Sequence, residues 1–482
     1  MSDVARLAPS PQDWPIEVGT AVSLEPGAQL LDRDLIAGGS PWRLLRLPGG
    51  ARAVAERWRS GGEVHVGEER FARTLVQQGL LFTHYRVDAT TDDVQVVIPV
   101  VDDVASLRPL LESLRGLSVT VVDDGSRHAQ LVRECAHDFG ATLVRLDVNR
   151  GPGAARNAGL SQSDAPFVWF LDVDVTLEDA RGVLARLRAA MRDPLAGAVS
   201  ARIRGGPGAS ARDRFEMGCG PLDLGERDAL VVAGGAVSYV PSACLLVRRT
   251  ALAGGFDETM RVGEDVDLVW RLSDQGWLVR YLAGVTVTHR ARGTWRHWWG
   301  QRVGYGRSAA ALASRHGQRV APVRVDLWTV LAWSSVLARQ PMIGARVVRA
   351  LHVSVRARLP ASTEEPARVA SSIVHRGVLT SSGPFARALV RTYGPLLLIA
   401  ALHPRLRRRA LGIFILGSAW RWRNRRAHAS DAALGIFDDL AYSVGVWRGA
   451  FEARSPQALR PYVVRSSMRL RDVLGLRAPS ES

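Results

Sequence analysis

The stretch Val94–Asp124, VQVVIPVVDDVASLRPLLESLRGLSVTVVDD, decides the fold of this chain. It holds two runs of apolar, mostly β-branched residues, separated by a segment around Leu107–Leu114 with leucines at helical spacing. Strands of a parallel sheet read as continuous apolar runs because helices cover both faces of the sheet. The stretch therefore predicts two parallel strands joined by a helix.

The same alternation continues beyond this stretch. Apolar runs recur at ATLVRL (141–146) and PFVWFLD (166–172), and a helix is expected after Pro152. Alternating strands and helices indicate an α/β protein with a doubly wound, mainly parallel sheet. We expect this domain to span residues 93–290.

The flanking regions have a different composition. Residues 1–23 are rich in proline and polar residues and are expected to form a loose tail, whereas residues 24–88 predict a small compact module. Residues 291–482 are rich in arginine and predict a helical C-terminal region. Within the module we expect a strand at 42–47, helices at 51–59 and 68–78, and a strand at 80–85.

Composition excludes several classes of protein. The 482 residues are 47% hydrophobic and 23% charged, which is typical of a folded chain of two or three domains. Three cysteines without a CxxC pair exclude a disulfide scaffold and a zinc ribbon. The net charge is +16 and every basic residue is arginine. From His289 onward the chain carries 32 Arg against 9 acidic residues, so an anionic partner is expected there.

The sequence favours a cytoplasmic location. The N-terminus lacks an apolar signal region, and no apolar run reaches about 18 residues. The segments 393–402 and 411–420 are apolar and flank an arginine cluster. This pattern fits either a hairpin lying peripherally on the anionic inner face of the cell membrane or a helical bundle with a solvated arginine face.

Acidic residues come directly after three of the predicted strands. They are Asp102–Asp103, Asp123–Asp124, and the pair Asp172 and Asp174. One such strand end is often only an N-cap for the next helix, but three at the same edge gather charge that favours a cation. Two carboxylates at i and i+2 suit Mg²⁺ or Mn²⁺ shared with a diphosphate.

Further polar residues lie at the starts of helices. The segment Asn149–Leu160 places Arg156 and Asn157 one turn into a helix, where they could hold a phosphate or a sugar hydroxyl. Glu264 and Asp265 open another helix, either as helix-dipole partners or as a general base. The sequence contains neither GxGxxG after the first strand nor GxxxxGK[ST], which disfavours dehydrogenases and P-loop NTPases.

Six elements in this order resemble the family 2 glycosyltransferases of the GT-A fold. They are VVIPV, VVDDGS, NRGPGAARNAGL, DVD, GGFDE and GEDVDLVWRL, over roughly residues 94–290. The resemblance implies a UDP-sugar donor held by Pro99, Asp123, Asp124, Arg156, Asn157 and Asp172, with Asp123 or Asp124 contacting uracil. It implies Mn²⁺ or Mg²⁺ at Asp172, Asp174 and His289, although a lone histidine at a strand end is as often structural.

The resemblance also implies a mechanism. Asp265, beside Glu264, would deprotonate the acceptor hydroxyl in a single inverting displacement. The processive members of the family carry a Q-x-x-R-W motif, but this chain has WWGQRVGYG at residues 298–306 instead, which disfavours a membrane-channelling polysaccharide synthase. Trp298 and Trp299 would either stack on an acceptor or pack their helix onto the sheet.

The N-terminal module narrows the choice of acceptor. Residues 24–85 look like a PqqD-type winged-helix module, which binds precursor peptides by strand addition. This module before a family 2 domain is similar to the glycosyltransferases of mycofactocin biosynthesis. That similarity implies transfer of glucose to a peptide-derived redox cofactor precursor, as a short β-1,4-linked glucan. A cell-envelope enzyme with a lipid-linked acceptor is the alternative, and the module is too weakly basic to favour nucleic acid.

Overall fold

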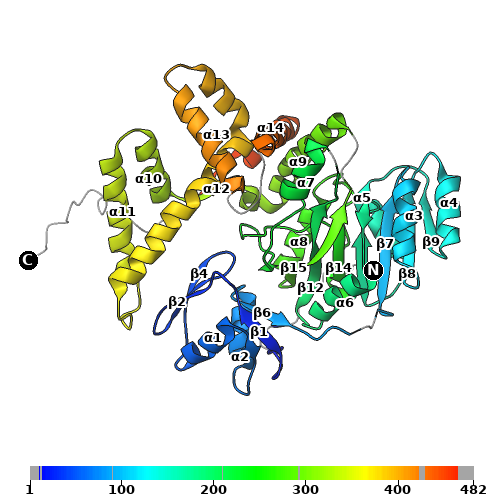
Figure 1. Ribbon diagram of the computed structural model, residues 1–482, viewed down its shortest axis with the longest axis horizontal. Coiled ribbons are helices and arrows are strands. Elements are labelled where there is room, and N and C mark those ends of the chain that lie inside the picture. Colours follow the sequence, from blue (N-terminus) through cyan, green and yellow to red (C-terminus); the bar gives the residue numbers. More distant parts are fainter. Residues whose placement is uncertain are drawn as a thin grey trace, which may run out of the picture. The chain divides into compact units, whose positions relative to one another are not determined.

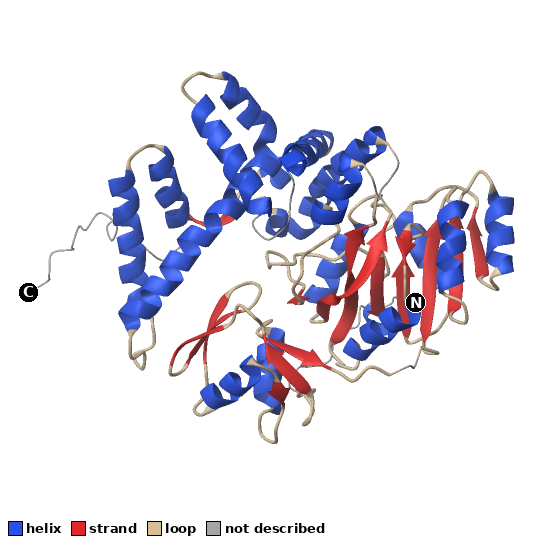
Figure 2. Cartoon of the chain, viewed as in Figure 1, coloured by secondary structure: helices blue, strands red, loops and turns tan. Residues whose placement is uncertain are grey.

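The computed structural model describes residues 10, 13–88, 91–208, 210–290, 294–422 and 429–464. The chain forms two compact units. The first comprises residues 1–29, 37–45 and 50–293, and the second comprises residues 30–36, 46–49 and 294–482. Figures 1 and 2 show strands concentrated in the first unit and helices in the second.

A nine-stranded mixed sheet forms the centre of the first unit. Its strands run in the order β11-β15-β12-β14-β10-β7-β8-β9, and β13 pairs with β15. The four strands β10, β7, β8 and β9 are parallel, whereas β14 is antiparallel to both of its neighbours. The bounds are β7 Val94–Val100, β8 Ser118–Asp124, β9 Thr142–Leu146, β10 Phe167–Leu171, β11 Val175–Thr176, β12 Ala196–Gly205, β13 Ala229–Leu230, β14 Cys244–Arg248 and β15 Leu278–His289.

Helices cover both faces of this sheet, as the apolar strands require. One face packs against α3, α4 and α6, and the other meets α5, where a Cβ on Gly159 would lie 2.4 Å from the Val97 side chain. The α/β expectation is therefore confirmed. The helical bounds are α3 Val104–Ser113, α4 Ala129–Asp138, α5 Pro152–Leu160, α6 Ala180–Ala190, α7 Ala211–Cys219 and α8 Glu264–Asp274.

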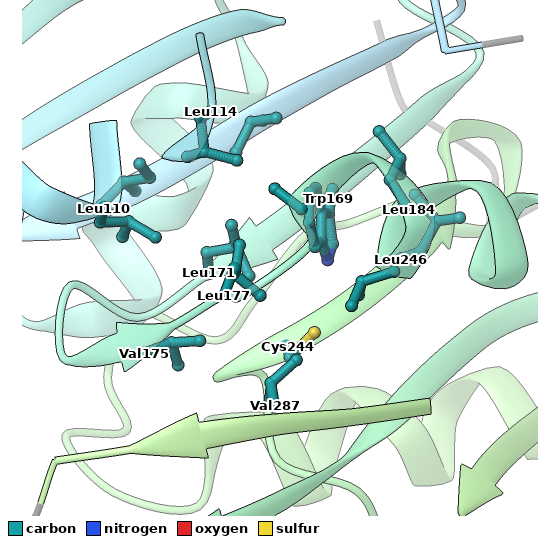
Figure 3. Packing of buried hydrophobic residues seen from close by; sticks show 14 of the residues in the cluster. Leu110, Leu114, Trp169, Leu171, Val175, Leu177, Leu184, Cys244, Leu246 and Val287 are labelled. Carbon is teal, nitrogen blue, oxygen red and sulfur yellow. The ribbon is translucent and has the colours of Figure 1, made fainter. Parts of the chain in front are cut away.

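The core lies between the sheet and the first of these helical layers. Trp169 and Leu171 on β10 point into it and are fully buried, together with Leu246 on β14 (Figure 3). Leu110 and Leu184 reach the same core from α3 and α6. Burying a side chain of this size stabilises a fold by about 1.5–3 kcal/mol, so this layer holds the strand ends in place.

The N-terminal residues contain more strands than the sequence predicted. Two small sheets form, in the orders β5-β1-β6 and β2-β3-β4. β1 begins at Ala21, inside the segment expected to be a loose tail, and pairs antiparallel with β6. Residues 1–9, 11 and 12 of that segment lie outside the described residues. The bounds are β1 Ala21–Leu24, β2 Gln29–Asp32, β3 Leu35–Gly38, β4 Arg43–Arg46, α1 Ala51–Arg59, β5 Gly62–Glu63, α2 Glu69–Gln77 and β6 Leu81–His84.

Two arginines fasten α2 and β6 to the large sheet of the same unit. Arg73 on α2 donates from Nη1 and Nη2 to the two carboxylate oxygens of Asp193, each over 2.9 Å. Both side chains are buried, with 4% and 0% exposure. Arg280 on β15 donates to the hydroxyl and the carbonyl of Thr83 over 2.9 and 3.0 Å. Both contacts are charge-assisted hydrogen bonds out of reach of solvent screening.

The second unit is mainly helical among its described residues. α9 and α14 pack closely, since a Cβ on Gly306 would lie 2.0 Å from the Tyr442 carbonyl. Arg302 donates to Asp438 over 2.7 Å between these helices, with both side chains buried. The bounds are α9 Trp295–His316, β16 Arg324–Asp326, α10 Leu327–Leu337, α11 Pro341–Arg356, α12 Pro366–Leu402, α13 Arg407–Trp422, α14 Ala429–Glu452 and β17 Tyr462–Val464.

One helix of the described residues, α12, has the length and apolar composition needed to cross a membrane. Only 22% of its most apolar window is buried. A single helix of this kind is weak evidence, because core helices of globular proteins can have the same composition.

Substituting Arg73 with methionine should destabilise the first unit by about 3–5 kcal/mol, because Asp193 would keep a buried charge without its partner. Urea unfolding followed by circular dichroism measures this loss. The matched control is Arg52→Ala on α1, whose ion pair with Glu56 is exposed and contributes about 1 kcal/mol or less. Equal effects of the two substitutions would contradict the role assigned to Arg73.

Candidate active site

The acidic strand ends meet at one edge of the sheet because their strands are parallel. β7, β8 and β10 end there with Asp102, Asp123–Asp124 and Asp172. β14 is antiparallel to both β10 and β12, so β12 runs in the same direction as β10. β15 is parallel to β12 and therefore brings His289, its last residue, to the same edge. Open α/β sheets bind ligands at this carboxyl edge, near the point where the strand order reverses. Here that point lies between β7 and β10.

Three of the predicted metal ligands lie together. One ligand atom from each of Asp172, Asp174 and His289 falls within 4.8 Å of the others. The His289 Nε2 atom is 3.0 Å from Asp174 Oδ1. Asp174 directly precedes β11, whose first residue, Val175, pairs with His289 on β15. Two carboxylates and an imidazole suit Mn²⁺, and Mg²⁺ would use mainly the oxygens. The donor set therefore fits the divalent cation that the sequence predicted.

Arg156 contacts acidic side chains, and it lies beneath the surface of the site. Its Nη1 donates to Glu264 Oε1 over 2.8 Å and its Nη2 donates to Asp172 Oδ1 over 2.6 Å. The side chain is only 3% exposed and packs over the Phe256 ring, 5.4 Å from the ring centroid. The guanidinium therefore links the end of β10 to the start of α8, which supports a positioning role. The expected contact with the donor stays a prediction.

Glu264 and Asp265 open α8, as the sequence predicted. Burial, together with the neighbouring Asp265 charge, raises the pKa of Glu264 to about 7, although Arg156 acts against the rise. Burial also raises the pKa of Asp265, again against Arg156. Glu264 is buried and bound to Arg156, whereas Asp265 remains partly exposed. Asp265 is thus the member of the pair that an acceptor hydroxyl could reach.

The two carboxylates expected at the nucleobase already have partners in the chain. Asp124 accepts hydrogen bonds from the backbone N–H groups of Arg150 and Gly151, over 2.7 and 2.9 Å. Asp123 is fully buried and pairs with Arg145. Asp124 therefore binds the amides that precede α5 and does not cap α4, the next helix along the chain, whose N-cap is His128. Its contact with uracil stays a prediction.

Two other residues predicted to bind the donor, Asn157 and Pro99, are half-buried. Asn157 accepts from the Phe256 N–H over 2.8 Å and donates to the Phe256 carbonyl over 2.9 Å, so it fastens the GGFDE turn to α5. Pro99 is half-buried on β7, opposite Val122 of β8. Neither the role of Pro99 nor that of Asn157 in donor binding is tested by these contacts, and both stay predictions.

The paired tryptophans belong to the second unit. Trp298 is 2% exposed and stacks on Phe437 with an interplanar angle of 3°. Trp299 packs against the same ring, with centroids 4.5 Å apart. Arg302 lies over Trp298, 4.9 Å from its centroid. These contacts pack α9 against α14 of the same unit, whereas packing onto the sheet was one of the two expectations. The acceptor role of Trp298 and Trp299 stays a prediction.

Sequence reasoning missed Arg145, which contacts Asp123 directly. The available signal was a charged residue inside the apolar run ATLVRL, at the end of β9. A charged side chain at that position has to face the carboxyl edge of the sheet or pair with an acidic residue at the end of another strand.

The doubly wound sheet, the acidic strand ends and the carboxylate–histidine cluster together define a glycosyltransferase with a GT-A-like fold. Residues 95–255 match the family described as Glycosyl transferase family 2. The chain belongs to this family.

Curated relatives share sequence with larger or smaller parts of the chain. It is 36% identical over 470 residues to the pre-mycofactocin glycosyltransferase of Mycobacterium tuberculosis, covering 92% of this chain and 98% of the relative. It is 32% identical over 283 residues to the N-acetylglucosaminyl-diphospho-decaprenol L-rhamnosyltransferase of the same species, covering 50% of this chain and 92% of the relative. The mannosyltransferase PcManGT of Pyrobaculum calidifontis, solved with GDP-Man and Mn²⁺, aligns with a TM-score of 0.43 and 17% identity over 76% of this chain and 90% of its own.

The rate of glycosyl transfer should rise with pH through an apparent pKa above the usual carboxylate range. Burial keeps a proton on the Glu264–Asp265 pair, and a base must lose it to act. Glu264→Gln removes the neighbouring charge but keeps an acceptor for Arg156, so the acid limb should move to lower pH. Profiles of kcat/KM against pH for both proteins measure this shift. An unchanged limb in an active variant would exclude coupling between the two carboxyls.

Proposed function

We propose that the chain is an inverting, divalent-metal-dependent hexosyltransferase that acts on a peptide-derived redox cofactor precursor, pre-mycofactocin. The observation that carries the catalytic part is the linkage Glu264–Arg156–Asp172, which holds the helix bearing Asp265 beside the metal-type triad. The name of the relative that matches 92% of the chain supports the acceptor. We further propose UDP-glucose as the donor and a short β-1,4-linked glucan as the product, as the family resemblance implies.

Two groups of residues serve different parts of the reaction, the leaving diphosphate and the acceptor hydroxyl. Asp172, Asp174 and His289 would hold Mn²⁺ or Mg²⁺, which when bound supplies positive charge to the diphosphate leaving group. Asp265 takes the proton from the acceptor hydroxyl as its oxygen attacks the anomeric carbon. The bond from that carbon to the diphosphate oxygen breaks on the opposite face, so the configuration inverts. Arg156 keeps Asp172 and Glu264 in place throughout the displacement.

The N-terminal module supplies a surface for the peptide part of an acceptor. In the sheet β2-β3-β4, the strand β4 lies at an edge. An edge strand presents backbone N–H and C=O groups to which an extended peptide can pair. The sheet β5-β1-β6 has fewer free backbone groups for a peptide on its edge strand β6, because Arg280 already binds the Thr83 carbonyl there. We therefore place strand addition, as in PqqD-type modules, at β4.

The proposed function predicts nucleotide release that needs Mn²⁺ and acceptor together. The protein is incubated with UDP-glucose or GDP-mannose and a Val-Tyr-derived acceptor, and free nucleotide and product mass are followed. UDP-glucose should give hexose additions to the acceptor, and the anomeric configuration by NMR should be inverted. Failure to release any nucleotide with all acceptors would refute the assignment.

Two variants separate the base from the metal ligands in the same assay. Asp265→Asn should lower kcat by about 10²- to 10⁴-fold while leaving UDP binding unchanged, since it removes only the general base. Asp174→Ala should instead abolish Mn²⁺-dependent UDP binding. Wild-type turnover by Asp265→Asn would show that another group takes the proton.

A lipid-linked acceptor is the alternative, and the helices of the second unit favour contact with a membrane. The end of α12 and the start of α13 expose apolar side chains together with four arginines that no described acid neutralises. They are Leu396, Leu398, Ile399, Leu402, Leu411 and Ile415, with Arg405, Arg407, Arg408 and Arg409. We propose that this surface lies on anionic lipid, where each arginine adds about 1 kcal/mol.

Flotation with liposomes tests the membrane proposal. The protein should float with vesicles containing phosphatidylglycerol at low salt and be released at high salt, because salt screens the attraction between the arginines and the anionic lipid. Leu402→Asp combined with Ile399→Asp should abolish flotation, whereas Val66→Asp, an exposed valine of the first unit, should not. Absence of flotation of the unaltered protein at low salt would remove the proposal.

A further inference from the structure

An arginine on β9 separates the predicted nucleobase ligand from the solvent. Arg145 lies directly opposite Asp123 in the parallel pairing of β8 with β9. The Arg145 side chain is 32% exposed, but the Asp123 side chain has no exposed surface. Of these two residues, only Arg145 has side-chain surface that solvent can reach.

The contacts of the pair explain this difference in exposure. Arg145 donates from Nη1 to Asp123 Oδ2, and its Nη2 lies 3.3 Å from the carbonyl oxygen of Ser126. The Ser126 N–H donates to the other carboxylate oxygen, Asp123 Oδ1, over 2.8 Å. Each oxygen of Asp123 therefore accepts a hydrogen bond from the chain. The two bonds made by Arg145 use two of the five N–H donors of its guanidinium.

The order of the strands places this guanidinium across the reversal point from the metal-type triad. The metal-type triad lies in the turn between β10 and β11 and at the end of β15, on one side of the point where the strand order reverses. β8 and β9 lie on the other side, beyond β7. If the diphosphate of a donor lies at the triad, a nucleoside that extends across the reversal point reaches the ends of β7, β8 and β9.

We propose that Arg145 is the residue that reads the nucleobase, by donating to a keto oxygen, and that Asp123 acts only by holding it. The inference rests on the proposed function, because it presumes a nucleotide-sugar donor. Uracil presents a carbonyl at C4 and guanine presents one at C6, and each accepts from arginine. Cytosine and adenine carry an amino group at the corresponding position, which would face the guanidinium donor to donor. The site should select keto bases against amino bases, and uracil against cytosine at equal ring size.

Competition between nucleotides tests this assignment. Dissociation constants of UDP and CDP are measured by calorimetry in the presence of Mn²⁺, so that the diphosphate contacts are the same. The unaltered protein should bind UDP about 10- to 100-fold more tightly than CDP, as expected for one charge-assisted hydrogen bond gained or lost. Arg145→Met should bring the UDP-to-CDP ratio close to one, mainly by weakening UDP. Arg145→Lys keeps one donor and should retain part of the preference.

Arg133→Met is the matched control. Arg133 is an exposed arginine on α4 that bonds Gln130, so this substitution removes the same charge without touching the strand ends. It should leave both dissociation constants unchanged. Melting temperatures of all variants confirm that each is folded.

The outcomes separate this inference from the proposed function. If UDP binds but Arg145→Met keeps the full preference, or binds UDP more tightly because Asp123 is uncovered, the nucleobase is read by another group and the assignment is overturned. The proposed glycosyl transfer would survive that result. If the unaltered protein binds no nucleotide with Mn²⁺, both the inference and the proposed function fail.

Discussion

The buried guanidinium of Arg156 holds the candidate active site together. It donates to Asp172 at the end of β10 and to Glu264 at the start of α8, and Asp265 adds a third acidic group nearby. Carboxylates gathered in a partly dehydrated site repel one another, and each would cost several kcal/mol without a counter-charge. One arginine offsets part of this repulsion and fixes the spacing between the strand that carries metal ligands and the helix that carries the base. The bound cation would complete the neutralisation.

The remaining elements of the first unit serve to place that guanidinium. α5 reaches the sheet closely because Gly159 lets its backbone lie against Val97 and Val122, and Asp124 secures the start of the helix through two amides. Asn157 fastens the GGFDE turn, which leads toward Glu264. The N-terminal helix α2 is fixed to the same body by a buried ion pair with Asp193. This ion pair fixes α2, within the first unit, to the loop that precedes β12.

Several features could be predicted because they depend on neighbouring residues. The long apolar strands, the helix at Ala51–Arg59 and the acidic residues at strand ends can be read from local patterning. The short strands β1, β2 and β3 were missed, since four residues give little periodicity and β1 is stabilised by β6, some 60 residues away. β14 was missed too, and it inserts antiparallel between β10 and β12.

The sequence by itself determined the α/β class, the edge of the sheet that binds ligand, and the residue types suited to a divalent cation. These properties are set by the hydrophobicity of the strands and by the residues at their carboxyl ends. Only the tertiary structure decided which charges meet. Arg156 and Glu264 are 108 positions apart, and Arg145 and Asp123 come from different strands. The sequence does not distinguish an arginine that faces a ligand from one that is buried beneath the ligand site. Burial and partners distinguish the two cases, because a covered guanidinium must satisfy its charge within the protein.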